Sequence, residues 1–112
     1  MNRYVIDGLL RDMFTGRLVL CLAWSAKGAQ EAFRLCSEAA AERHAEVRVY
    51  RANGCERIIA PSGGCICFRS TRQTVRGFSG DVLAAERYAV EVLVDVLEWG
   101  PLRASFTEAI VL

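Results

Sequence analysis

The feature that most constrains the fold of this chain is a continuous apolar run, Leu-Val-Leu-Cys-Leu-Ala, at residues 18–23. A run of this length without polar alternation is typical of a strand that is buried on both faces. Strands of this kind lie inside parallel sheets that are covered by helices. The run therefore predicts a three-layer, Rossmann-like α/β fold with a mostly parallel sheet.

Amphipathic helices are predicted on both sides of this strand. Residues 3–14 carry apolar side chains at three- and four-residue spacing, and Gly16 follows where a helix C-cap would stand. Ser25 is a suitable N-cap for a second helix that runs through His44, with an apolar stripe on one side. The position of His44 near the end of that helix favours a capping role over catalysis.

A small β-hairpin is expected after the second helix. Residues 47–50 and 57–60 have the composition of short strands, and Asn53-Gly54 between them supplies a turn that can adopt positive φ. Gly63-Gly64 follows in another turn. These two glycines could form an anion-binding nest, but a turn between strands explains both without a ligand.

The second half of the chain is predicted to add strands to the sheet. Residues 65–69 form a strand of alternating character, residues 70–80 a polar loop, and residues 81–85 a second buried strand. The tail, residues 108–112, is expected to be a final strand.

The segment 89–99 has two interpretations. Its polar residues recur at helical spacing, which predicts a helix. Its valines also alternate, which leaves a strand as the alternative. In either case Gly100-Pro101 is expected to end the element. The polar stripe of the helix consists of Glu91, Asp95 and Glu98.

The composition favours one compact globular domain over residues 1–112, because 53% of the residues are hydrophobic and the net charge is only +1. No stretch reaches the ~20 apolar residues that a membrane-spanning helix requires. Arg3, Asp7 and Arg11 interrupt any signal-peptide core. A cytoplasmic protein without a membrane partner is therefore expected.

The five cysteines, at positions 21, 36, 55, 65 and 67, are expected to be reduced thiols. Their number is odd, and most of them stand in apolar strand or helix patterns. Cys65 and Cys67 would share one face of a strand, but no further pair of cysteines or histidines completes a metal site. We therefore expect neither a metal nor a cofactor.

The segment from Ile66 to Leu83 resembles part of the large-subunit terminases, the motors that package phage DNA. In that family, a strand ending in an arginine and small hydroxyl residues leads to an Arg-Gly-aromatic turn. Gly-Asp follows, and then the apolar strand that ends in the Walker B acids. Here the turn is Arg76-Gly77-Phe78 and the strand is Val82 to Ala85.

The resemblance implies a phage-encoded, P-loop-ATPase-like domain whose sheet is incomplete. The chain contains no G-x-x-x-x-G-K-[ST] loop, which would hold the phosphates. Glu86 stands in the first acidic position of a degenerate Walker B sequence, and Arg87 places a cation where the second acid belongs. The resemblance thus implies a truncated, non-catalytic relative in the cytoplasm of the host cell.

Three arginines, Arg69, Arg72 and Arg76, are the candidate contacts to phosphate or nucleic acid. The resemblance implies this role, because the equivalent loop of helicase-like motors lies near nucleic acid or a neighbouring subunit. Solvated loop arginines, one of them paired with Asp81, are the simpler interpretation.

Three functions are therefore predicted as alternatives. The preferred one is a protein-interaction module that forms a homodimer or captures a phage or host protein. An incomplete sheet leaves backbone groups unpaired, so either the final strand lies beside residues 82–85 or another chain fills the gap. The second is a DNA-binding accessory protein that uses the segment Arg69–Arg76. The third is an ATPase fragment completed in trans by another polypeptide.

Overall fold

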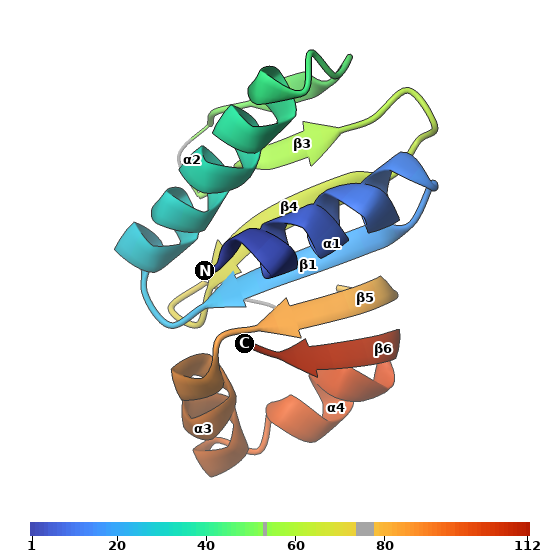
Figure 1. The fold of residues 1–112 in the computed structure, drawn as a ribbon. Helices are drawn as coiled ribbons and strands as arrows, with labels where there is room; N and C mark the ends of the chain where they lie inside the picture. Colours follow the sequence, from blue (N-terminus) through green and yellow to red (C-terminus); the bar gives the residue numbers. More distant parts are fainter. Residues whose placement is uncertain (53, 74–77) are drawn as a thin grey trace.

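A computed structural model describes residues 1–52, 54–73 and 78–112 of the chain. Its elements form a six-stranded sheet with helices on both faces, which confirms the predicted α/β fold (Figure 1). In chain order these are α1 (Arg3–Phe14), β1 (Leu18–Ala23), α2 (Ala26–Glu42), β2 (Arg48–Tyr50), β3 (Arg57–Ile59), β4 (Cys65–Ser70), β5 (Gly80–Ala85), α3 (Arg87–Asp95), α4 (Trp99–Ala104) and β6 (Phe106–Val111).

The strand order across the sheet is β2-β3-β4-β1-β5-β6. The four strands β4, β1, β5 and β6 are parallel, and the predicted hairpin of β2 and β3 joins them antiparallel to β4. β6 begins two residues before the predicted tail strand and pairs in parallel with β5. The sequence left two candidates for the position beside residues 82–85, the final strand or another chain. The final strand, β6, occupies that position.

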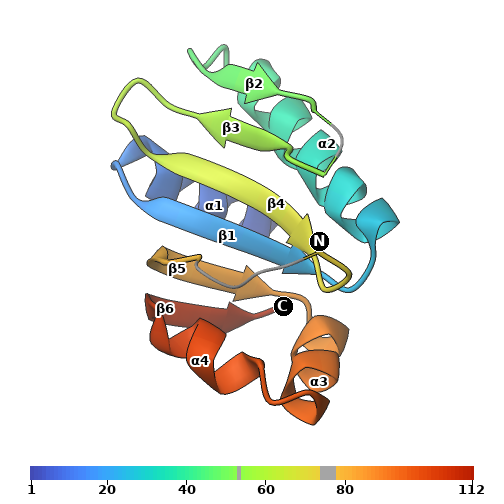
Figure 2. The same cartoon turned by 180° about the vertical axis from the view of Figure 1, so that it is seen from behind.

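The helices divide the apolar core into two clusters, one on each face of the sheet. α1 and α2 cover one face, where Leu10, Phe33 and Phe68 are buried together. α3 and α4 lie on the other face, over β5 and β6, and bury Leu83 and Leu93 there (Figure 2). No helix in the described part of the chain has the length and apolar character of a membrane-spanning segment.

Three helices end in the same way, with a residue at positive φ just after the C-cap. These residues are Gly16 (φ 90°), His44 (φ 53°) and Leu97 (φ 60°). At each end, two backbone N–H groups donate back to carbonyls in the last turn, the arrangement of a Schellman motif. The capping roles predicted for Gly16 and for His44 are thereby confirmed, whereas Leu97 occupies a position that usually favours glycine.

The prediction for the helix boundary at Gly100-Pro101 is wrong. α3 already ends at Asp95, and Leu97 turns the chain into α4, which contains both Gly100 and Pro101. Pro101 is tolerated because it lies in the first turn of α4, where a backbone N–H has no partner within the helix. The alternative of a strand at residues 89–99 is excluded by the same two helices.

Gly64 is required by a close approach between the turn before β4 and the end of α1. A Cβ atom at this position would overlap the carbonyl group of Met13. The same carbonyl accepts a hydrogen bond from the Ser62 hydroxyl at 3.1 Å. The N–H groups of Gly63 and Gly64 donate to the Ala60 carbonyl and the Ser62 hydroxyl, respectively, so the turn interpretation of these glycines holds.

Gly64→Ala is expected to destabilise the protein by more than about 2 kcal/mol, because the backbone of α1 would have to move. Gly100→Ala is the matched control. A Cβ at position 100 meets no atom within 4 Å, and alanine favours the helix by roughly 0.5–1 kcal/mol. Urea unfolding of both variants measures the difference. Equal stability of the two would contradict the close approach.

Candidate functional site

After the carboxyl ends of the neighbouring strands β1 and β5, the chain continues toward opposite edges of the sheet. β1 leads through α2 to the strands on one side, whereas β5 leads through α3 and α4 to β6 on the other (Figure 1). Ligands of open α/β sheets bind in the crevice at such a point. A cavity of about 410 Å³ lies there, between these strand ends and helices α1 and α2.

Glu86, the residue of the degenerate Walker B sequence, lies at this crevice. Its Oε2 accepts a hydrogen bond from the backbone N–H of Trp24 at 3.2 Å, and its own N–H donates to the Leu22 carbonyl at 2.8 Å. The residue thus joins the end of β5 to the end of β1. These two hydrogen bonds hold the ends of the two strands together.

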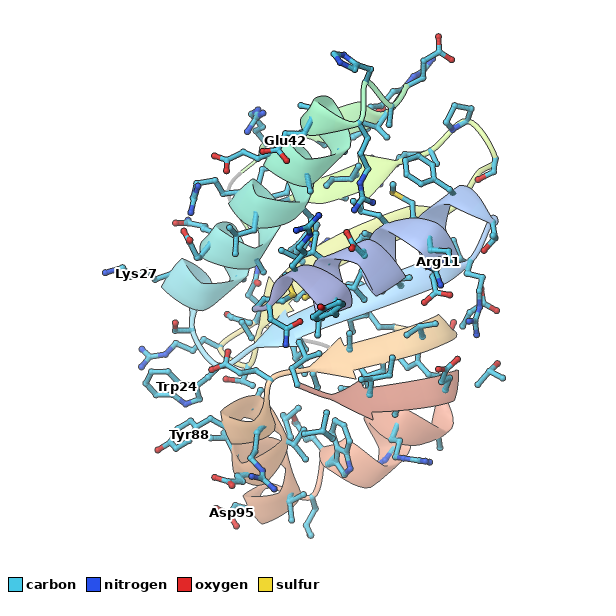
Figure 3. All side chains as sticks on the ribbon, viewed as in Figure 1. Arg11, Trp24, Lys27, Glu42, Tyr88 and Asp95 are labelled. Carbon is cyan, nitrogen blue, oxygen red and sulfur yellow. The ribbon has the colours of Figure 1, made fainter. Side chains whose placement is uncertain are left out.

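The crevice is acidic. Glu31 and Glu86 are its charged side chains, and no arginine or lysine side chain lines the cavity in the described residues. Lys27 lies nearby on α2 but points away from the molecule (Figure 3). Glu31 is itself paired with Arg34 of α2.

The structure places two of the three predicted arginines and gives them different neighbours. Arg69 donates to the carbonyls of Phe68 and Glu56, at 2.8 and 3.3 Å, and its guanidinium lies over the Phe78 ring. Arg72 lies over the ring of Trp24 at the carboxyl end of β1, 5.4 Å from its centroid. Arg76 lies outside the described residues.

Trp24 joins several elements at this end of the sheet. Its ring meets Tyr88 of α3 edge to face at 5.3 Å, as the labelled side chains in Figure 3 show. The Thr71 hydroxyl donates to the Trp24 carbonyl at 2.7 Å. Arg72 is therefore held against an aromatic pair. Asp81, considered as an arginine partner, accepts a hydrogen bond from the N–H of Leu18.

Figure 2 shows that α3 and α4 leave one face of strands β2, β3 and β4 uncovered. The strand register places a second group of arginines on this face. The strand register places Tyr50, Arg57 and Cys67 side by side across three strands. Arg57 lies over the Tyr50 ring at 4.5 Å. Arg48, Arg57 and Arg69 share this face, which we call the open face.

Sequence reasoning missed Arg48 and Arg57 as candidate residues. The two-residue alternation of the hairpin was the signal that could have revealed them. Val49 and Ile58 point to the core, so the neighbouring Arg48 and Arg57 must point to the opposite face of the sheet. The sequence did not indicate that this face would lack a helix.

The two edges of the sheet differ in how well they accept a further strand. β2 has three residues and carries Arg48. β6 has six residues, and its charged side chain, Glu108, is paired with Arg17 at 3.1 Å. Short charged edges resist further pairing, whereas long apolar edges invite it. The free edge of β6 is therefore the accessible one.

Exposed apolar side chains accompany the free edge. Val111 of β6 is 52% exposed, and at the far end of α3 Val94, Val96 and Leu97 are 50%, 56% and 84% exposed. This end of α3, marked by Asp95 in Figure 3, projects beyond β6. The edge of β6 and the end of α3 both carry exposed apolar side chains, and we call the two together the β6 surface.

The fold is shared with two phage proteins. The large terminase of bacteriophage HK97 matches 96% of this chain with a TM-score of 0.67 and 12% identity. The large terminase of a second, thermophilic bacteriophage, whose structure contains ADP, matches 96% with a TM-score of 0.59 and 12% identity. The resemblance in the sequence is thus confirmed as a similarity of fold.

The chain spans about a quarter of these terminases, 25% and 28% of their lengths. The sequence matches no protein-family model and no curated protein.

Glu86→Ala is expected to lower stability by roughly 1 kcal/mol, because the N–H of Trp24 loses its acceptor. Glu86→Gln is the control, since its amide oxygen can accept the same hydrogen bond. Urea unfolding compares the two. If Glu86→Ala is as stable as Glu86→Gln, the hydrogen bond to Trp24 does not join the strands.

Proposed function

We propose that the chain is a non-catalytic protein-interaction module with a phage terminase-like fold, and that it pairs with a second copy of itself through β6. The observation that carries this proposal is the free edge of β6, together with the exposed apolar side chains of β6 and of the end of α3. The names of the structural neighbours support a place for the module in terminase-like phage machinery.

The backbone of β6 supplies the pairing groups. The N–H of Leu112 donates to the Ala85 carbonyl at 2.8 Å, toward β5. Alternate residues of a parallel strand bond to opposite sides, so Ala109 and Val111, which precede Leu112 at odd spacing, direct their backbone groups outward. Unpaired rows of this kind are templates for another strand.

A two-fold axis through the free edges would pair β6 antiparallel with its copy. Such an interface is self-complementary, because each copy presents the same patch to the other. Both α3 helices would then lie on the same face of the continuous sheet. Their exposed ends, including Val94 and Leu97, would be buried in the contact.

The proposal of a non-catalytic role is supported by the crevice at β1 and β5. Its charged side chains are both carboxylates, and Glu86 is engaged with the backbone of β1. No cationic side chain among the described lining residues would neutralise the charge of a transferred phosphoryl group. We therefore expect the purified chain to hydrolyse no ATP.

Val111→Pro is expected to weaken self-association by roughly tenfold or more, about 1.4 kcal/mol. Proline removes an outward N–H in each copy but no hydrogen bond between β5 and β6. Light scattering over a concentration series measures the mass of the wild-type chain and of the variant. The wild type is expected to be a dimer.

Tyr4→Ala is the control for loss of exposed apolar surface. Tyr4 is 85% exposed on α1, on the opposite face of the sheet from α3. The variant should remain as dimeric as the wild type. A wild-type chain that is monomeric at every concentration, or a Val111→Pro variant that dimerises normally, would contradict pairing through β6.

A second candidate function is binding of nucleic acid at the open face. Arg48, Arg57 and Arg69 place three guanidinium groups on one uncovered side, next to the rings of Tyr50 and Phe78. Guanidinium groups bind phosphates, and exposed rings stack on bases. The sequence-based hypothesis placed the nucleic-acid contact on the segment Arg69–Arg76. The contact proposed here keeps Arg69 and adds Arg48 and Arg57 of the hairpin.

Replacing Arg48, Arg57 and Arg69 together by Gln is expected to abolish binding of a short DNA oligonucleotide. In the wild type, affinity should fall steeply with salt, with a slope of about −0.7 to −0.9 for each phosphate contact. Fluorescence anisotropy at several salt concentrations measures both. Arg34→Gln is the control, because Arg34 is paired with Glu31 and Glu38 on α2. If Arg34→Gln loses as much DNA affinity as the triple variant, the open face is not the DNA-binding surface.

A further inference from the structure

Cys65 and Cys67 form a pair of neighbouring thiols on the open face. They lie two residues apart in β4, so both side chains emerge on the same side of the sheet, and their Sγ atoms are 3.4 Å apart. Both are partly accessible to solvent. Cys21 and Cys36, in contrast, are buried, and burial raises the pKa of each thiol to about 12.

The surroundings of the pair favour a thiolate on Cys67. Arg57 is the register partner of Cys67 on β3, and Arg69 follows two residues later on the same face. The hydrogen bond between the two thiols, and then the charges of Arg69 and Arg57, lower the pKa of Cys67. The same hydrogen bond raises the pKa of Cys65. One thiol is therefore poised as a nucleophile and the other remains protonated beside it.

A cavity gives small molecules access to the two sulfurs. It has a volume of about 410 Å³ and is lined by both cysteines together with mostly apolar side chains, among them Leu18, Phe78 and Phe106. A small, uncharged oxidant such as a hydroperoxide fits this chemistry, because it needs no charged partner in order to enter. The thiolate is the form of cysteine that attacks it.

We propose that Cys65 and Cys67 are a reversible redox site that reacts with hydroperoxides. The Cys67 thiolate attacks one peroxide oxygen, the O–O bond breaks, and the departing hydroxide takes a proton to become water. Cys67 is then a sulfenic acid, oxidised by two electrons. The sulfur of Cys65 attacks that of Cys67, the S–O bond breaks, and hydroxide leaves with the proton of Cys65 as a second water. Two thiols and one hydrogen peroxide thus give one disulfide and two waters.

The position of the pair in β4 makes the disulfide easy to reduce. The sulfurs must approach from 3.4 Å to a bond of about 2.05 Å. Residues two apart in a strand have Cα atoms roughly 6.6 Å apart, at the upper end of the roughly 4.4–6.8 Å that disulfides span. The bond therefore draws β4 together where it pairs with β1 and β3. Strained disulfides of this kind are the more readily reduced ones.

The test treats the folded, full-length chain with hydrogen peroxide and follows its thiols by mass spectrometry. A Cys55→Ser background removes the exposed cysteine outside the pair. Trypsin releases residues 58–69 as one peptide that contains both cysteines. This peptide is expected to lose two hydrogens on oxidation and to regain them with dithiothreitol, while Cys21 and Cys36 stay unmodified.

Two variants assign the roles. Cys67→Ser is expected to slow the reaction with peroxide by roughly tenfold or more, because the thiolate is lost. Cys65→Ser should react at the wild-type rate and accumulate a sulfenic acid that dimedone traps, because no second thiol resolves it. The proposal is overturned if the 58–69 peptide stays reduced while Cys55 of the wild type is oxidised. Equal rates for both variants also overturn it.

Discussion

The burial of β1 between β4 and β5 is the interaction on which the rest of this structure depends. From Val19 to Ala23 no side chain of β1 is more than 5% exposed, and parallel neighbours bond to both of its edges. A strand of this kind needs helices on both faces, which α1 and α2 supply on one side and α3 on the other. From this centre the sheet extends to its two edge strands, β2 and β6.

The local pattern of the sequence predicted the elements near β1 because each face there is buried in a regular way. Ser25 caps α2 as expected, and Gly16 ends α1. The prediction was wrong at Gly100-Pro101, since Leu97 takes the positive φ that usually belongs to glycine. No local pattern shows which strand faces lack a helix. The sequence therefore could not predict that this face would be open. It also could not predict that Arg69 would lie on it together with Arg48 and Arg57 of the hairpin.

The three surfaces of the molecule suit different partners. The crevice at Glu86 is lined by the carboxylates of Glu31 and Glu86. The open face combines three arginines with the thiol pair. The β6 surface combines unpaired backbone groups with exposed apolar side chains. Because unpaired edges and apolar patches are the features that proteins protect, the proposed self-association rests on the β6 surface.

The most direct test of this account is amide hydrogen exchange of β6, measured by NMR at a low and a high protein concentration. If β6 pairs with a second copy, the outward N–H groups of Ala109 and Val111 should become protected as the concentration rises. The inward N–H of Leu112, already bonded to Ala85, should change less. Rapid exchange of the outward amides at both concentrations would contradict the pairing of β6 with a second copy.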